Sequence, residues 1–189
     1  MAQQLSLFEE PARELNPDPL FFALLPDDEA TRSIEQLAQN FRQAHGLTGS
    51  LRPLHVTLCD LTVRTSTQKT IDVASKAADA VTAAPFRIAF NRAARFGGGK
   101  GDRPFVLIGD DGVTGAARFR QTLSLELRMA DLGKWTASFT PHLTLLYDKT
   151  LPDDRDIAPI AWTAREFVLL RSVVGQTRHD VLGRWPLLG

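Results

Sequence analysis

The sequence carries one short pattern twice, and this repeated pattern constrains the fold more than any other feature. Histidine is followed two residues later by threonine at His55 and Thr57 and again at His142 and Thr144, each time among apolar residues. Side chains alternate between the two faces of a strand, so each histidine shares a face with its threonine. Both segments are therefore predicted to be half-buried strands that present imidazole and hydroxyl groups to one groove. If the first strand continues, Cys59 lies on the same face, as a buried and inert thiol.

Length and composition limit the class of protein. The 189 residues are 43% apolar, which is enough to bury the core of one domain or of two lobes that share an interface. The 22 basic and 22 acidic residues cancel, which argues against strong nonspecific binding to nucleic-acid phosphates or anionic membranes. The single cysteine excludes an internal disulfide framework and a multi-cysteine zinc site. No apolar run has the length of a membrane helix. We therefore expect a soluble, cytoplasmic monomer without a membrane partner.

Strand and helix patterns alternate around the two motifs. Strands are expected at 20–25, 54–58, 86–90, 104–108, 141–145, 166–171 and 179–185, and helices at about 26–45, 67–83 and 114–131. The aspartates at 153, 154 and 156 are assigned to a solvated loop. Each half of this order contains one His-x-Thr strand, and the sequence shows no further repeat.

Residues 1–18 differ in composition from the rest of the chain. They combine polar residues and prolines around one apolar cluster without periodicity, so we expect a flexible tail before a single domain at 19–189. The cluster Gln4-Leu5-Ser6-Leu7-Phe8 resembles the short peptide by which bacterial replication and repair proteins bind the sliding clamp. Its leucines and phenylalanine offer anchors for a hydrophobic pocket on such a partner. The alternative is that the cluster packs on its own domain.

The paired histidines indicate acid/base chemistry. A lone histidine on an apolar strand is more often structural, but two in matched surroundings favour a functional site. Imidazole titrates near neutrality, so one ring can accept a proton while the other donates one. This suits attack of water on phosphorus with departure of an alkoxide, while Thr57 and Thr144 bind phosphate oxygens or orient the imidazoles. No metal or other cofactor is then expected. Metal ligation is the competing interpretation, although two histidines without a carboxylate or cysteine at a recognisable spacing are fewer ligands than a metal site usually has.

The same residues resemble the signatures of a known family. His55-Val56-Thr57-Leu58 and Phe139-Thr140-Pro141-His142-Leu143-Thr144-Leu145 are similar to the paired motifs of the two-histidine (2H) phosphoesterases. From about Leu20 onward the chain most resembles the RNA 2′,3′-cyclic phosphodiesterase branch, historically called 2′-5′ RNA ligase. The resemblance implies a bilobal α+β fold, with two antiparallel sheets flanked by helices and a central groove that carries the two His-x-Thr strands.

The resemblance also implies roles for the motif residues. His55 would protonate the leaving 3′-oxygen and His142 would activate water, yielding a 2′-phosphate, while Thr57 and Thr144 would hold the phosphate. The residues themselves do not assign which histidine is the acid and which is the base.

Two positions depart from the family pattern. Many relatives have arginine three residues after the second motif's threonine, where this chain has Tyr147, and many have tyrosine where this chain has His179. The sequence therefore does not assign the cation that binds the phosphate. Tyr147 itself is a candidate RNA contact. Basic residues near the glycine-rich turn at 97–101 are candidate contacts to RNA phosphates, with a solvated basic loop as the alternative. These residues are Arg92, Arg95, Lys100 and Arg103.

Taken together, the sequence predicts a metal-independent phosphodiesterase that opens 2′,3′-cyclic phosphates at the ends of RNA or nucleotides. One rival is the same scaffold acting on another cyclic phosphate or on a 2′-5′ oligonucleotide. A second rival is a non-catalytic RNA-binding or clamp-tethered adaptor. Ligation, the reverse reaction, could use the same site, but nothing in the sequence encodes ATP-dependent activation of an RNA end.

Overall fold

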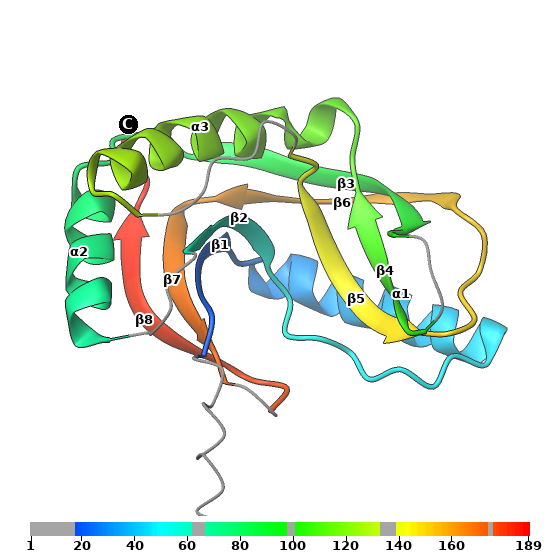
Figure 1. Ribbon diagram of the computed structural model, residues 1–189. Helices are drawn as coiled ribbons and strands as arrows, with labels where there is room; N and C mark the ends of the chain where they lie inside the picture. The colour runs from blue at the N-terminus through cyan, green and yellow to red at the C-terminus, as the bar shows by residue number, and fades with distance from the viewer. Residues whose placement is uncertain (1–17, 62–66, 98–100, 133–138, 174–175) are drawn as a thin grey trace, which may run out of the picture.

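A computed structural model describes residues 18–61, 67–97, 101–132, 139–173 and 176–189. Along the chain the elements are β1 (Leu20–Leu24), α1 (Asp28–His45), β2 (Val56–Leu61), α2 (Gln68–Asp79), β3 (Phe86–Arg95), β4 (Arg103–Ile108), the short helix η1 (Asp111–Val113), α3 (Thr114–Met129), β5 (His142–Asp148), β6 (Arg155–Ala164), β7 (Glu166–Ser172) and β8 (His179–Pro186). The strands form one sheet of order β6-β3-β4-β5-β2-β1-β7-β8, and every neighbouring pair is antiparallel (Figure 1).

This single sheet confirms the α+β class and corrects the expectation of two separate sheets. The strands do form two groups of four, β6-β3-β4-β5 and β2-β1-β7-β8, but the groups are joined where β2 pairs with β5. The register at this join is Val56 opposite Leu143. Each group contains one motif strand, so the join brings the two motifs to the middle of the sheet.

Local sequence explains where α1 begins and ends and where α2 begins. The carboxylate of Asp27 accepts a hydrogen bond from the Ala30 N–H at 2.8 Å and so caps α1. Gly46 ends α1 in the left-handed conformation, which glycine adopts without strain. The hydroxyl of Thr67 caps α2 in the same way, accepting from the Thr70 N–H at 3.3 Å. The three predicted helices are confirmed, each ending within a few residues of its expected limits.

The strand β6 is missing from the predicted order. The sequence assigns Asp153, Asp154 and Asp156 to a solvated loop. Asp153 and Asp154 do precede the strand and are exposed, but Asp156 lies in β6, which runs from Arg155 to Ala164 and pairs with β3. β6 lies at the edge of the sheet, and it contains Pro159. An edge strand tolerates proline and polar residues because one row of its backbone groups needs no partner in the sheet. Such a strand lacks the clear apolar alternation that identifies the others.

The main core covers one face of the sheet and spans both groups of strands. Phe22 and Phe167 contribute from one group, and Phe90 and Phe105 from the other. The helices lie along this core, with α2 beside β8, α3 along β3 and α1 near β6 (Figure 1). A smaller cluster occupies the opposite face of β1 and β7, and it consists of Phe21, Ala23, Val168 and Leu170. The face of the sheet opposite the main core therefore has an apolar cluster on β1 and β7, and among the described residues no helix covers it beside the motif strands.

Some predictions fall outside the described residues. These are the sliding-clamp peptide at residues 4–8 and Lys100. In the part of the chain that the structure does describe, no helix has the length and apolar character needed to cross a bilayer.

Candidate active site

The two motif strands are direct neighbours at the centre of the sheet. The residues that follow the two histidines, Val56 and Leu143, stand opposite each other in antiparallel register. One step further along this register, each histidine stands opposite the threonine of the other motif. These pairs are His55 with Thr144, and His142 with Thr57. Residues directly opposite on one face of an antiparallel pair have Cβ atoms about 4.5–5.5 Å apart, so the four side chains lie within one small area.

These four side chains line a cleft of about 280 Å³. The lining residues come from β1, β2, β5, β7, β8 and the segments just before β1 and β2. They are Pro19, Phe21, Arg52, Pro53, His55, Thr57, Asp60, His142, Thr144, Tyr147, Ser172 and His179. A cleft near the lower end of the usual size range for ligand pockets suits a small ligand or the end of a longer one.

The backbone orients both imidazoles in the same way. His55 Nδ1 lies 2.7 Å from the carbonyl oxygen of Pro53, and His142 Nδ1 lies 2.8 Å from that of Thr140. A carbonyl oxygen only accepts, so each Nδ1 must carry the hydrogen and donate it. A neutral ring then presents a lone pair on Nε2, and a protonated ring presents an N–H at the same atom. Each histidine can therefore act at Nε2 as a base or as an acid.

The two histidines differ in their surroundings. Burial lowers the pKa of His55 to about 4; the hydrogen bond to Pro53 opposes the shift, and smaller electrostatic contributions from His179, His142 and Arg52 add to it. The ring of Phe21 packs against His55 with centroids 5.1 Å apart. His142 instead packs against Phe96, at 4.8 Å. His55 is thus neutral at pH 7 in the free protein.

His179 is a third histidine in the cleft. Its ring meets that of His55 edge to face, with centroids 4.8 Å apart, and it also contacts Phe21. Burial, with a smaller contribution from the charge of Arg52, lowers the pKa of His179. The sequence marked His179 only as a departure from the family pattern. Its position depends on the pairing of β8 with β7, where His179 stands opposite Ser172, and nothing near it in the sequence signals this.

A β-bulge follows the threonine in the first motif strand. Thr57 pairs with Ala23 and Cys59 pairs with Phe22, which leaves Leu58 as an extra residue in β2. An extra residue reverses the faces of all later positions in its strand. The strand alternation that holds up to Thr57 therefore fails beyond it.

This bulge overturns the prediction that Cys59 shares a face with His55. The Cys59 sulfur instead points to the core side, where it lies 3.2 Å from the hydroxyl oxygen of Ser124. Burial raises the pKa of the Cys59 thiol, in keeping with the inert thiol that was expected. The same reversal turns Asp60 into the cleft, a residue that the sequence reasoning missed. Partial burial raises the pKa of Asp60, and the charge of Arg120 opposes this shift.

The second motif strand has a bulge at the equivalent position. Thr144 pairs with Val106 and Leu146 pairs with Phe105, which leaves Leu145 as the extra residue in β5. In both strands the bulge is three residues after the histidine, and the residue five after the histidine lines the cleft. That residue is Asp60 in one motif and Tyr147 in the other. The repeat in the structure is thus longer than the His-x-Thr repeat in the sequence.

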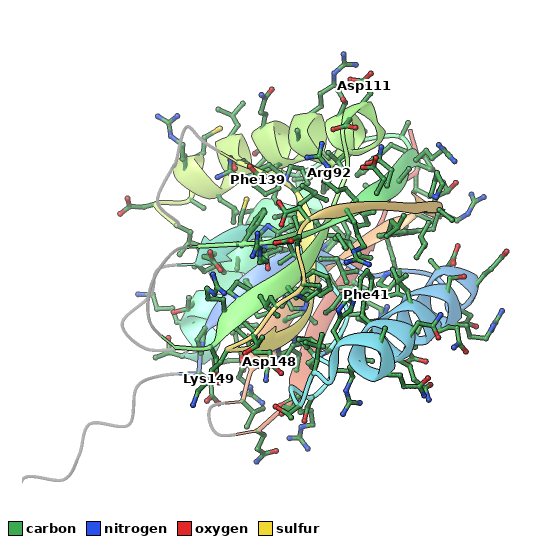
Figure 2. The ribbon with its side chains drawn as sticks, turned by 90° about the vertical axis from the view of Figure 1, so that its right-hand side faces the viewer. Phe41, Arg92, Asp111, Phe139, Asp148 and Lys149 are labelled. Carbon is green, nitrogen blue, oxygen red and sulfur yellow. The ribbon has the colours of Figure 1, made fainter. Side chains whose placement is uncertain are left out.

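Arg92 lies outside the cleft lining but on the same face of the sheet as His142. It pairs with Ile108 on β4, and Ile108 pairs with His142 on β5, so Arg92 is two strands away from the histidine. Its guanidinium group is 3.8 Å from Asp110 and 3.9 Å from Asp156. Figure 2 shows Arg92 well apart from the end of β5, where Asp148 and Lys149 are labelled. Its role as an RNA contact stays a prediction.

Arg95 and Arg103 also lie outside the cleft lining. The Arg95 guanidinium group is 3.0 Å from Asp153 and 3.6 Å from Asp154. Arg103 stands opposite Asp148 in the pairing of β4 with β5. The structure does not bring these two arginines to the motif residues, and their contacts to RNA likewise stay predictions. Among the described residues, no three His, Cys, Asp or Glu side chains gather closely enough to hold a metal ion.

Comparisons with known proteins give the same picture of the fold. A model of the 2′-5′ RNA ligase superfamily matches residues 26–176. Among solved structures, TT0787 of Thermus thermophilus aligns with a TM-score of 0.70 and 22% identity, over 90% of this chain and 98% of that chain. Escherichia coli LigT complexed with 3′-AMP aligns with a TM-score of 0.68 and 24% identity, over 90% and 98%.

A third and more distant neighbour is Usb1 of Kluyveromyces marxianus. It aligns with a TM-score of 0.54 and 11% identity, over 91% of this chain and 98% of that chain. Among curated protein sequences, none matches this chain significantly. At these identities the solved structures establish the shared fold.

Proposed function

Because the chain belongs to the 2′-5′ RNA ligase superfamily of 2H phosphoesterases, we propose that its cleft hydrolyses the 2′,3′-cyclic phosphate at the end of an RNA or a nucleotide to a 2′-phosphate. One observation carries this proposal. Two imidazoles, each held through Nδ1 by a backbone carbonyl, lie in one cleft on neighbouring strands, and each stands opposite a threonine hydroxyl.

The proposed reaction is one in-line displacement at phosphorus. One histidine accepts a proton from water at Nε2 as the water oxygen bonds to phosphorus, and the bond from phosphorus to the 3′-oxygen breaks. The other histidine donates the proton on its Nε2 to that 3′-oxygen, so the product has a 2′-phosphate and a 3′-hydroxyl. The protein ends with the two histidines in exchanged protonation states, and exchange with solvent restores the starting form.

Thr57 and Thr144 are the proposed phosphate ligands. Both hydroxyl groups face the cleft, and each stands opposite the histidine of the other motif. A hydroxyl group donates one hydrogen bond, so the two threonines can each bind one non-bridging oxygen. Donors fixed in this way stabilise the charge that builds on those oxygens in the transition state.

The resemblance assigns the acid role to His55 and the base role to His142. With a pKa of about 4 in the free protein, His55 holds no proton at pH 7. In this assignment His55 must gain its proton when the substrate binds, because the anionic phosphate raises the pKa of a neighbouring imidazole. A substrate with sulfur at the bridging 3′ position tests the roles. Thiolate leaves without an acid, so only the variant that lacks the acid regains turnover.

The solved relatives support a nucleotide substrate. E. coli LigT has been solved with 3′-AMP and, separately, with phosphate, so the shared fold accommodates these ligands in that protein. The rival functions remain another cyclic phosphate or a 2′-5′ oligonucleotide on the same scaffold, and an adaptor that binds RNA without turnover. A small panel of such substrates, assayed with the same preparation, discriminates among them.

Substitution of each histidine tests the proposal. His55→Ala and His142→Ala should each lower the turnover of a 2′,3′-cyclic-phosphate dinucleotide by about 100-fold to 10,000-fold, the usual contribution of a general acid or base. His45→Ala, which removes an exposed histidine at the end of α1, is the matched control and should keep full activity. A chelator should have no effect on the wild-type rate. Full activity in either cleft variant would exclude the proposed chemistry.

A further inference from the structure

The lining of the cleft includes one arginine, Arg52, that has no role in the proposed reaction. A phosphodiester carries a negative charge, and a site that binds it gains from a fixed positive charge close by. Among the residues that line the cleft, Arg52 is the one arginine or lysine. It lies three residues before His55, in the segment that leads into β2.

Arg52 differs from several arginines elsewhere on the sheet in having no acidic partner among the described residues. Arg92, Arg95 and Arg171 each contact an aspartate within 4.0 Å. For Arg52 the described residues provide no carboxylate partner within that distance. Its guanidinium group lies instead over the ring of Tyr147, 5.6 Å from the ring centroid. Such a contact restricts the side chain and leaves the N–H donors at the edge of the guanidinium plane free for an anion.

The backbone around Arg52 is fixed to the second motif strand. The Arg52 N–H donates to the carbonyl oxygen of Leu145 at 2.8 Å. Leu145 is the bulge residue of β5, so the same irregularity that turns Tyr147 into the cleft also receives the backbone of Arg52. The two members of the stacked pair are therefore positioned by one feature of the fold.

A carboxylate secures the preceding residues. Asp148 accepts hydrogen bonds from the N–H groups of Thr48 at 2.7 Å and Gly49 at 3.0 Å, and from Thr150 at 3.2 Å. These bonds lower the pKa of Asp148 to about 2. Gly49 passes so close to β5 that a Cβ atom there would overlap the carbonyl oxygen of Tyr147. The backbone just before Arg52 is therefore held against the end of β5 by these hydrogen bonds and by close packing.

The charge of Arg52 already acts on the catalytic region. It contributes to the lowering of the pKa of His55 and of His179, although burial is the larger cause in both. A group bound between these rings therefore lies within the field of the guanidinium. Asp60 is the carboxylate of the same lining; partial burial raises its pKa, and the charge of Arg120 opposes this shift.

We propose that Arg52, held over Tyr147, is the cation that binds the phosphate group in this cleft, and that Tyr147 is its positioning residue. This inference rests on the proposed function, because it takes the bound anion to be the phosphate of that substrate. Arg52 would thus supply the positive charge that many relatives are expected to have at the position of Tyr147. Arg52 precedes β2 and Tyr147 lies in β5, so the two neighbouring motif strands each contribute one residue to this contact.

The test measures the binding of adenosine 2′-monophosphate and of inorganic phosphate to the full-length protein. Arg52→Ala should raise both dissociation constants about 10-fold to 100-fold, the usual cost of losing a charge-assisted hydrogen bond. Arg52→Lys keeps the charge but loses the planar contact, so it should fall between Arg52→Ala and the wild type. Arg32→Ala removes an exposed arginine of α1 outside the cleft and should bind both ligands as the wild type does.

Tyr147 is tested by a conservative pair of variants. Tyr147→Phe keeps the ring and should bind phosphate as the wild type does, whereas Tyr147→Ala should weaken binding by about two-fold to five-fold. The double variant Arg52→Ala with Tyr147→Arg should recover part of the lost affinity, since position 147 lines the same cleft. Recovery would show that a cation at this point of the cleft can replace Arg52, whereas a loss in Tyr147→Ala that Tyr147→Phe does not share would show that the ring positions Arg52.

The outcomes separate this inference from the proposed function. Phosphate binding that depends on Arg52, in a protein that turns over no cyclic phosphate, would leave the inference standing and remove the proposed function. Turnover and phosphate affinity that are both unchanged in a folded Arg52→Ala variant would overturn the inference alone. If Arg52→Ala does not fold, Arg52→Lys decides, because unchanged phosphate affinity there, combined with no effect of Tyr147→Ala, would also overturn it. A wild-type protein that binds neither probe would do the same.

Discussion

Individual residues of the cleft differ in how far the sequence could predict them. The four motif residues could be predicted because a two-residue spacing maps directly onto one face of a strand. Asp60 could not, because its face depends on a bulge that only the pairing of β2 with β1 reveals. His179 arrives through strand pairing, and Arg52 lies in an irregular segment before β2. These three positions follow from tertiary structure rather than from local pattern.

Burial of His55 couples the stability of the fold to pH. The unfolded chain binds a proton on this histidine near the ordinary pKa of 6.5, whereas the folded protein binds it only near 4. Between these values the unfolded state holds more protons, so the stability falls as the pH falls from about 6.5 to about 4. The shift corresponds to a loss on the order of 3 kcal/mol.

Urea unfolding at several pH values measures this effect. The free energy of unfolding of the wild type should decrease across that range, and the decrease should be smaller in His55→Ala by roughly the amount above. Ser50→Ala, which removes an exposed residue that does not titrate, should keep the wild-type slope. An equal slope in His55→Ala would mean that the folded protein accepts a proton on His55 at its ordinary pKa.

At the scale of elements, the two motif strands are equivalent beyond their shared residues. Each has a histidine held by the carbonyl two residues before it, a threonine on the same face, and a bulge at the next position. The sequence showed the first two parts of this repeat as His-x-Thr. It did not show the bulge, because leucine occupies the bulge position in both strands and is equally common in a regular strand.

The segment before β2 gives a prediction at this scale. Gly49→Ala should force the segment at 48–52 away from β5, because the new Cβ atom meets backbone rather than a movable side chain. We expect a loss of about 1–3 kcal/mol in the free energy of unfolding and weaker phosphate binding, since Arg52 moves with the segment. Ser50→Ala, at the exposed neighbouring position, is the control and should change neither quantity. Wild-type phosphate affinity in Gly49→Ala would show that the position of this segment does not control Arg52.

On the scale of the whole molecule, the two groups of strands share one sheet and one core. The sequence predicted the α+β class and the two halves, because alternating and helical patterns reveal the elements. It could not predict the single sheet, because the join depends on the pairing of Val56 with Leu143, far apart in the chain. The main core continues across this join. The domain should therefore unfold as one cooperative unit despite its central cleft.

Two tryptophans report on the two groups separately. Trp162 lies in β6, at one edge of the sheet, and Trp185 lies in β8, at the other. Trp135, outside the described residues, is replaced by phenylalanine in both reporter variants. Trp162→Phe and Trp185→Phe in that background leave one reporter each, and the fluorescence and circular dichroism transitions of a given variant should coincide. Two separate transitions within one variant would show that the groups unfold independently.

The proposed chemistry is tested most directly by the product that the wild-type protein forms from a defined RNA with a 2′,3′-cyclic phosphate end, in water enriched in ¹⁸O. We expect a terminal 2′-phosphate that contains one ¹⁸O atom, formed at the same rate with or without a chelator. RNA that is bound but returned unchanged would contradict this expectation, as would a product that carries a 3′-phosphate.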